Sequence, residues 1–222
     1  MIRLPNKFDG ENITLKVELN EQVDVTVLYP DVKSLDTELV KQLKNVDKLY
    51  LTVSNMESSI NENRTISYIE IIFKIPVIIG DSCYNFPIIS YVSNPYSLIR
   101  GFFLGFYKEL EFHYEFKKSE IHFEKENLFK FDFNFNQQNS NLASLPQSYN
   151  EPLILFNNSS LVNTNYGYTL LNIDKYVLID RECYKFSKIS IGHFLGAEAK
   201  SCMVIFSHDK FQVNGIRKWK ED

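Results

Sequence analysis

Residues 94–110, NPYSLIRGFFLGFYKEL, place one lysine, Lys108, in a run of Phe, Leu, Gly and Tyr. An ammonium group among apolar neighbours is poorly solvated, so it holds its proton less tightly and the neutral amine becomes available. A neutral amine can add to a ketone and form a Schiff base. The alternative is that the Lys108 side chain runs along a core element and places its charge in solvent. Asn94-Pro95 is a turn-initiating pair, and a short helix is expected across Tyr96–Phe103.

The sequence before this stretch predicts a β-hairpin. Ser67 to Ile79 is rich in β-branched residues, Gly80-Asp81-Ser82 is typical of a turn, and Phe86 to Val92 returns to a strand pattern. Pro76 interrupts the first arm, which favours an edge strand or a bulge at that point. The second arm leads directly into residues 94–110.

Short strands are predicted along most of the remaining chain, because apolar or aromatic residues alternate there with polar ones. The expected strands are 13–19, 23–27, 49–53, 109–116, 129–135, 153–156, 166–173, 176–179, 184–191 and 203–206. Two polar stretches are expected to be loops, 55–65 and 137–150.

Helices are expected at few places. An amphipathic helix is predicted between Asp31 and Asn45, where four apolar residues recur at helical spacing: Leu35, Leu39, Val40 and Leu43. Ser34 or Asp36 would cap its start. A second short helix is expected at Gly192–Lys200. Many short strands with few helices favour a mainly β (α+β) fold, an antiparallel barrel or sandwich, in a single domain over residues 1–222.

Composition and motifs narrow the function. The net charge of −4 gives no electrostatic reason to expect nucleic acid or an anionic membrane as a partner. The start of the chain lacks a signal-peptide core, and no apolar run reaches the length of a membrane span, so a cytoplasmic, soluble protein is expected. The three cysteines and four histidines lie at no metal-ligand spacing, and no nucleotide-binding or zinc-protease motif occurs. No metal and no cofactor is therefore expected.

Residues 68–110 resemble the acetoacetate decarboxylase superfamily. That family carries a Tyr-x-Glu on a strand, a hairpin, a short helix, and a Gly-Arg-Glu segment that runs into Gly-Phe-Pro-Lys-Lys-Leu. The corresponding segments here are Tyr68-Ile69-Glu70, the hairpin, Arg100-Gly101-Phe102 and Gly105-Phe106-Tyr107-Lys108-Glu109-Leu110. Lys108 occupies the place of the first lysine of the pair, and its separation from Glu70 is close to the spacing in that family.

The resemblance implies a β-barrel or cone-like fold with a central cavity, often in a large homo-oligomer. It implies that Lys108 forms a Schiff base with a small-molecule carbonyl substrate and that Glu70 shuttles a proton or positions that substrate. It also implies that the substrate-binding residues are Arg100, Phe102, Phe106 and Tyr107.

The sequence departs from the family at three places. Glu109 replaces the second lysine, although alternation along an extended segment would turn Glu109 away from Lys108. Arg100 and Gly101 are exchanged, and Phe102 stands in place of the family glutamate. Glu11 falls near the place of the arginine that binds the substrate carboxylate in the decarboxylases.

Three hypotheses follow from these observations. The leading one is an acetoacetate decarboxylase-like lyase that acts on a keto acid or a related carbonyl compound through a Lys108 Schiff base. The second is an aldolase-dehydratase on the same scaffold, because the missing arginine would change the choice of substrate. The third is a non-catalytic β-barrel that binds an apolar small molecule in an interior lined by Phe and Tyr side chains.

Overall fold

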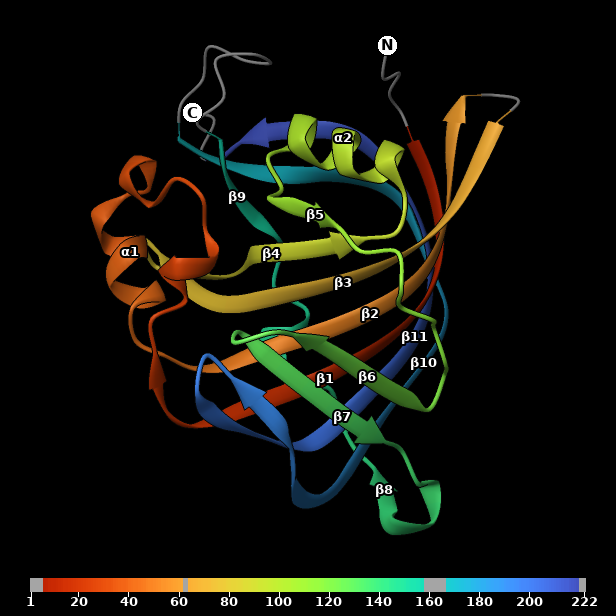
Figure 1. Cartoon of the computed structure of the whole chain (residues 1–222). Coiled ribbons are helices and arrows are strands. Elements are labelled where there is room, and N and C mark those ends of the chain that lie inside the picture. The colour runs from red at the N-terminus through yellow and green to blue at the C-terminus, as the bar shows by residue number, and fades with distance from the viewer. Residues whose placement is uncertain (1–5, 62–63, 158–166, 220–222) are drawn as a thin grey trace.

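A curved β-sheet forms most of the protein. The structure is a computed structural model that describes residues 6–61, 64–157 and 167–219 (Figure 1). Its strands are β1 (Asn6–Val23), β2 (Val46–Asn61), β3 (Arg64–Ile79), β4 (Ser82–Val92), β5 (Lys108–Leu110), β6 (Glu120–Lys125), β7 (Phe129–Asn134), β8 (Ser140–Leu142), β9 (Ile154–Asn157), β10 (Gly167–Phe194) and β11 (Ala197–Lys218). The order across the sheet is β5-β4-β3-β2-β1-β11-β10-β7-β6, and β8 and β9 also pair with β10. Among these strand pairs, β4 and β5 run parallel and the others run antiparallel. The predicted mainly β class is confirmed.

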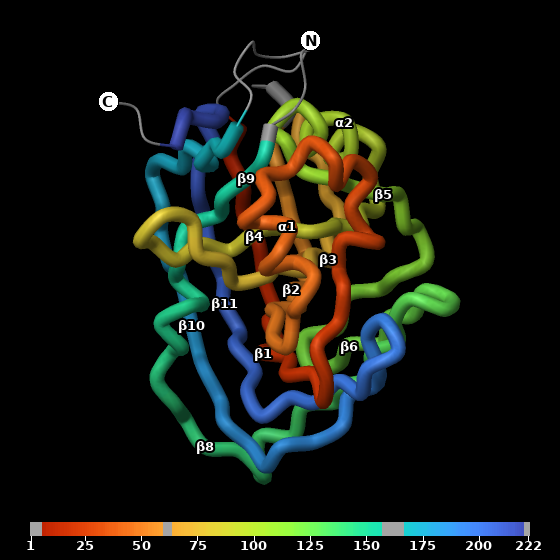
Figure 2. The backbone as a smooth tube through the Cα atoms, turned by 90° about the vertical axis from the view of Figure 1, so that its left-hand side faces the viewer, coloured from red at the N-terminus to blue at the C-terminus, as the bar shows by residue number. Residues whose placement is uncertain are grey.

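The sheet curls so that its two ends meet through side chains. Figure 1 shows the β6–β7 hairpin crossing in front of β1 and β2, and Figure 2 shows the curvature from the side. Phe73 of β3 packs against Phe129 and Phe131 of β7, with ring centroids 4.8 and 5.7 Å apart. Aromatic rings of this kind bury a large apolar area each and favour tilted contacts at these distances. A core of tilted aromatic rings therefore fills one part of the space that the curved sheet encloses.

Two α-helices occur in the described part of the chain, α1 (Thr37–Leu43) and α2 (Pro95–Leu104). Both were predicted. The Asp36 carboxylate accepts hydrogen bonds from the main-chain N–H groups of Glu38 and Leu39, so the expected cap of α1 is confirmed. Four 3₁₀ turns also occur: η1 (Val25–Leu28), η2 (Val32–Ser34), η3 (Gln137–Asn139) and η4 (Gln147–Tyr149).

The β3–β4 hairpin has the predicted form. Its pairs run from Glu70–Val92 to Ile79–Ser82 around the turn at Gly80, whose φ is +62°. Pairing between β2 and β3 stops at Lys74, so Pro76 lies where β3 has lost its β2 neighbour. Its missing N–H therefore costs no bond to β2, as expected for proline at an edge.

Three expectations for the N-terminal half were wrong. The predicted strand at 23–27 is replaced by the end of β1 at Val23 and the 3₁₀ turn η1, because the Asp24 side chain accepts from the Thr26 N–H and caps that turn. The predicted loop at 55–65 is the meeting point of β2 and β3, where Asn55 pairs with Ile69 and buried Met56 alternates with exposed neighbours. The predicted strand at 109–116 ends at Leu110. It ends there because β4, its only described neighbour, stops at Val92 and the chain then turns into α2.

Two expectations for the C-terminal half were also wrong. The predicted strands at 166–173, 176–179 and 184–191 are one continuous strand, β10, from Gly167 on, and residue 166 lies outside the described residues. The charged residues between them are not in turns: Asp174 lies at a register shift, and Arg181 and Glu182 pair regularly with β11. The predicted helix at 192–200 is a β-hairpin. Its turn uses Leu195 and Gly196, both with positive φ, and Gly192 pairs with Ala199.

Candidate functional site

The sheet register brings Glu70 and Lys108 to the same face. Ser90 of β4 pairs with Lys108 of β5 in the parallel ladder, and two residues later on β4 Val92 pairs with Glu70 of β3. Residues directly opposite one another in a ladder, and residues two apart on a strand, point to one face. The hairpin and the short edge strand therefore place both side chains together, although 38 residues separate them.

Lys108 and Glu70 form a direct, largely buried ion pair. The Lys108 Nζ atom lies 2.6 Å from Glu70 Oε1, and the same oxygen accepts a hydrogen bond of 2.6 Å from the Ser90 hydroxyl. The Lys108 side chain is 7% exposed and that of Glu70 is 15% exposed. Lys108 Nζ also lies 5.3 Å from the centroid of the Phe106 ring. The amine thus points into the protein, which rejects the alternative that it reaches solvent.

Helix α2 covers this pair. Asn94 caps its N-terminus by accepting from the Tyr96 N–H, and Gly105, at φ +91°, ends it in a left-handed conformation. Gly101 faces Lys108, and a Cβ placed on Gly101 would come within 2.4 Å of Lys108 Cδ and Cε. The absence of a side chain at Gly101 therefore creates the space in which the lysine stem lies.

Arg100 reaches the same region from the inner face of α2. Its Nη1 donates to the Ser58 hydroxyl at 2.7 Å, and its guanidinium lies 4.6 Å from the centroid of the Phe8 ring. Nη2 is buried and has no hydrogen-bond partner within the described residues. A buried guanidinium group normally has its donors filled, so this free donor is available to a ligand oxygen.

A cavity of about 480 Å³ connects these side chains. Apolar residues that line it include Phe8, Ile72, Leu104, Phe106, Leu153 and Phe211. Charged side chains come from four strands, from α2 and from the segment after η4: Glu70, Lys74, Arg100, Lys108, Glu151, Arg181 and Asp209. A largely apolar cavity with a few converging polar groups is the usual form of a small-molecule site.

Opposing effects set the protonation of Glu70. Burial would raise the pKa of its carboxyl group, but the Lys108 charge and the hydrogen bonds from Lys108 and Ser90 outweigh burial and hold that pKa below its ordinary value. Burial and the Glu70 charge raise the pKa of the neighbouring Tyr68, so its phenol stays neutral. The resting site is therefore an ammonium–carboxylate pair beside a neutral phenol.

The comparisons with known proteins concern the fold. No protein-family model matches the sequence, and neither does any curated protein. Among solved structures, an acetoacetate decarboxylase-like enzyme from Sphingomonas wittichii RW1 is similar at a TM-score of 0.63 with 15% identity, over 98% of this chain and 94% of that enzyme. The enduracididine biosynthesis enzyme MppR is similar at a TM-score of 0.62 with 10% identity, over 98% of this chain and 90% of MppR. The chain has the acetoacetate decarboxylase-like fold. The acetoacetate decarboxylase of Legionella pneumophila is also similar, at a TM-score of 0.54 with 11% identity, over 97% and 88% of the two chains.

On this acetoacetate decarboxylase-like fold, the structure brings four of the six predicted site residues to the cavity: Lys108, Glu70, Arg100 and Phe106. It places Phe102 and Tyr107 outside the cavity lining. Phe102 is 49% exposed, whereas the buried residues of α2 on either side of it are Arg100, Gly101 and Leu104. Tyr107 points to the opposite face from Lys108, where its ring packs on Tyr29.

The departures from the family pattern also have definite positions. The Tyr107 hydroxyl donates to Glu109 at 2.9 Å, so Glu109 lies on the face away from Lys108, as alternation predicted. Glu11 forms an ion pair with Lys118 at 2.6 Å and is not part of the cavity lining. Neither carboxylate competes with Glu70 for the Lys108 ammonium.

Sequence reasoning missed the other end of this cavity, which consists of Lys74, Tyr149, Arg181 and Asp209. These residues come from β3, η4, β10 and β11, so no local motif unites them. One signal was present. Lys74 stands alone in the apolar run IIFKIPVII, the same kind of setting that drew attention to Lys108.

Metal-binding clusters and membrane-spanning helices were sought in residues 6–61, 64–157 and 167–219. In these ranges, no cluster of three or more His, Cys, Asp or Glu side chains is arranged to hold a metal ion. Neither described helix has the length and apolar character needed to pass through a bilayer.

Proposed function

We propose that the protein is an acetoacetate decarboxylase-like lyase that acts on a keto acid through a Schiff base at Lys108. The observation that carries this proposal is the Lys108–Glu70 pair, buried at 2.6 Å in a cavity large enough for a small molecule. An amine becomes a nucleophile once a base removes its proton, and Glu70 is the base in direct contact.

The reaction begins with proton transfer. The Lys108 ammonium gives a proton to Glu70, and the neutral amine adds to the carbonyl carbon of the substrate. Loss of water, with the proton returned from Glu70 to the departing oxygen, leaves a protonated imine. The free Nη2 of Arg100 supports binding of the substrate carboxylate beside it.

The imine then serves as the electron sink. For a β-keto acid, the bond to the carboxylate breaks, CO₂ leaves, and the electron pair moves to the iminium nitrogen to give an enamine. Protonation of the enamine carbon and addition of water release the ketone and restore the Lys108 amine. Glu70 accepts a direct hydrogen bond from the Lys108 nitrogen at 2.6 Å, so its carboxylate can supply and recover these protons.

Borohydride trapping tests the proposal. The folded protein is incubated with a panel of 2- and 3-keto acids and sodium borohydride, and the adduct is located by peptide mass mapping. We expect a gain equal to the substrate mass minus one oxygen (water lost on imine formation, two hydrogens gained on reduction) on the peptide that contains Lys108, and no adduct in Lys108→Met. Folded protein that forms no adduct with any member of the panel would contradict the proposal.

A second reaction on the same amine is aldol condensation followed by dehydration. It is supported by the position of Glu11, which falls near the place of the family's carboxylate-binding arginine but lies outside the cavity, so a substrate carboxylate would be held from a different direction, by Arg100 of α2. MppR was solved with the condensation product of pyruvate and imidazole 4-carboxaldehyde. Incubation with pyruvate and an aldehyde, with Lys108→Ala as control, separates the two: a condensation product without CO₂ release identifies the aldolase-dehydratase.

A further inference from the structure

The cavity holds unbalanced cations. Lys108 and Arg181 each have a carboxylate within 4 Å, at 2.6 Å and 3.5 Å. Arg100 and Lys74 also line the cavity, but no carboxylate of the described residues forms an ion pair with either of them. Charges removed from bulk water are normally paired, so two cations without a counter-charge indicate places where a ligand anion binds.

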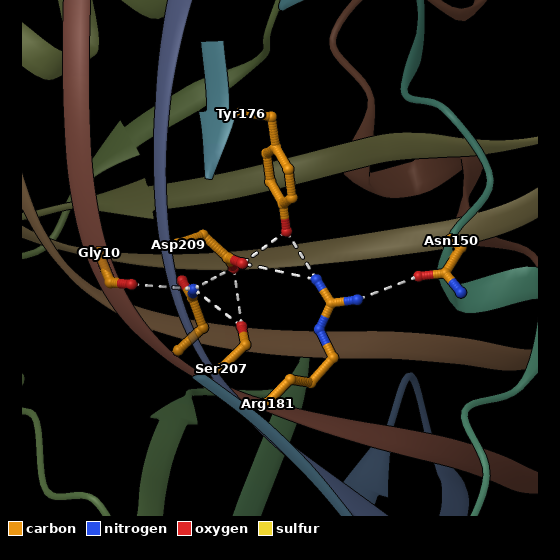
Figure 3. A network of polar contacts seen from close by, with 7 residues as sticks. Gly10, Asn150, Tyr176, Arg181, Ser207 and Asp209 are labelled. Atoms are coloured by element: carbon orange, nitrogen blue, oxygen red, sulfur yellow. Dashed lines mark hydrogen bonds and ion pairs between the residues drawn. The ribbon is translucent and has the colours of Figure 1, made fainter. Parts of the chain in front are cut away.

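Asp209 lines the cavity together with Lys74, and its oxygens are already occupied (Figure 3). Oδ2 accepts from the Asn12 amide at 3.1 Å and from the Ser207 hydroxyl at 2.8 Å. Oδ1 accepts from the Tyr176 hydroxyl at 2.5 Å and lies 3.5 Å from Arg181 Nη2. Asp209 is thus held by four donors, and it acts on Lys74 only through space.

Lys74 and Arg181 share one aromatic ring. Lys74 Nζ and Arg181 Cζ each lie 5.6 Å from the centroid of the Tyr149 ring. Cations near a ring face are favoured, but two of them at one ring repel each other unless anions lie between or beside them. Asp209 supplies one negative charge to this end of the cavity, which leaves a place for a second.

The two unpaired cations lie on opposite sides of the proposed reaction centre. Arg100 donates to Ser58 of β2, whereas Lys74 pairs with Tyr50, eight residues earlier on that strand. Glu70 lies four residues before Lys74 on β3, between these two positions, and points into the same cavity. A ligand that touches both cations would therefore extend across the Glu70–Lys108 pair.

We infer that the ligand of this cavity carries two anionic groups, one held by Arg100 and a second, distal one held by Lys74. Together with the proposed Schiff base at Lys108, on which this assignment of a substrate rests, the chemical class is an oxo-dicarboxylic acid. Glu70 and Asp209 form ion pairs with two of the four cations that line the cavity, Lys108 and Arg181, so a ligand with one anionic group would leave either Arg100 or Lys74 without an ion-pair partner.

The charge of Lys74 supports this role. Burial lowers the pKa of its ammonium group to about 8, while the charges of Glu70 and Asp209 oppose that shift. The ammonium form therefore predominates at pH 7. Tyr149 lies against Lys74, Tyr50 is its partner in the β2–β3 ladder, and Arg181 lies near the same Tyr149 ring; burial raises the pKa of both phenols, so they are neutral at pH 7.

Binding of unreactive acids tests the inference without Schiff-base chemistry. Calorimetry at pH 7 compares straight-chain dicarboxylates from glutarate to suberate with the monocarboxylates of equal chain length. We expect at least one dicarboxylate to bind about tenfold more tightly than its monocarboxylate, the order of one charge-assisted hydrogen bond. Equal binding of each pair in the wild type would overturn the inference.

Variants assign the effect to Lys74. Lys74→Met should reduce the affinity of the preferred dicarboxylate about tenfold and change that of the monocarboxylate less than twofold, whereas Lys74→Arg, which keeps the charge, should retain the preference. Lys48→Met is the matched control, because Lys48 is an exposed lysine on neighbouring β2. A dicarboxylate preference that survives in Lys74→Met also overturns the inference, and thermal melting verifies that each variant is folded.

The same proteins separate this inference from the proposed function. A dicarboxylate preference without any borohydride adduct at Lys108 would support the second anion site and contradict the Schiff-base proposal. An adduct at Lys108 with no preference for dicarboxylates would support the Schiff base and overturn the second anion site.

Discussion

Gly101 of α2 lies directly against the aliphatic stem of Lys108, so close that a Cβ on Gly101 would come within 2.4 Å of two lysine carbons. The helix and the edge strand β5 therefore fit together only because residue 101 has no side chain. The position of the amine depends on a contact that involves no polar group.

Gly101→Ala is expected to displace the Lys108 ammonium from Glu70. The borohydride trapping rate should fall about tenfold, because a shift of about 1 Å in a reacting group has a large effect on rate. Stability should change little, since alanine gains up to about 1 kcal/mol of helix propensity over glycine. Ile99→Ala, at an exposed position of the same helix, is the control and should leave trapping unchanged. Normal trapping in Gly101→Ala would show that Lys108 is not held by this contact.

The Lys108–Glu70 pair should show strong coupling in a double-mutant cycle. Glu70→Gln leaves a buried ammonium without its counter-charge and should cost about 2 kcal/mol or more of the free energy of unfolding. Lys108→Met leaves the carboxylate unpaired and should also destabilise. The double variant should be more stable than the sum of both losses predicts, with a coupling energy of about 1–3 kcal/mol, measured by urea unfolding. Additive losses would mean that the two groups do not interact in solution.

Stability at acid pH should depend on Glu70. Its pKa is lower in the folded protein than in the unfolded chain, so the unfolded chain binds more protons as the pH falls through and below the ordinary value of 4.5. Its contribution is thus present above that pH and is lost below it. Urea unfolding between pH 3 and 7 should show a smaller loss of stability in Glu70→Gln than in the wild type. Parallel curves would contradict the lowered pKa.

Lys74 should affect the stability of the fold at alkaline pH. Its pKa of about 8 in the folded protein is below its ordinary value of 10.5, so the unfolded chain holds more protons between these values. The free energy of unfolding should therefore rise with pH above 8. Lys74→Met should lack this rise, and a comparison between pH 7.5 and 9.5 stays below the titration of the tyrosines, whose ordinary pKa is about 10.

A homo-oligomer, which the family resemblance implies, is proposed to form at β10. Residues 172–180 of this strand are all exposed, and within the described chain they pair only with β11. An open strand edge that carries Val177, Leu178 and Ile179 is a template for pairing with another chain. Light scattering should give a multiple of 26.0 kDa for the wild type and a smaller mass for Val177→Lys. A monomeric wild type would reject the proposal.

The sequence was sufficient for the parts of the fold that local chemistry determines. Asp36 as a helix cap, the turn at Gly80 and the helix after Asn94 each depend on a few neighbouring residues. The separation of Glu70 and Lys108 was also informative, because a hairpin and one short helix lie between them. Strand ends were harder to predict. The alternating pattern of 109–116 continues beyond Leu110, but the neighbouring strand that it would need ends at Val92.

The second end of the cavity could not be predicted from local patterns. Asp174-Lys175 and the charged residues after Ile179 have the composition of turns. Only pairing with β11 makes them part of a single strand, and that pairing cannot be seen in the local sequence. Arg181 therefore reaches the cavity from a segment that was expected to be a solvent-exposed connection. Phe102 was misplaced for a related reason, since the direction of a side chain on α2 depends on which face of the helix meets the sheet.

The parallel pairing of β5 with β4 has a consequence for how this protein can change by insertion and deletion. Lys108 is the first residue of a three-residue strand, and a slip of one position in that strand would turn the amine to the opposite surface and present Tyr107 or Glu109 in its place. The loop between Leu104 and Lys108 should consequently tolerate substitutions more readily than changes of length. In this segment, the number of residues is therefore under stronger evolutionary constraint than their chemical identity.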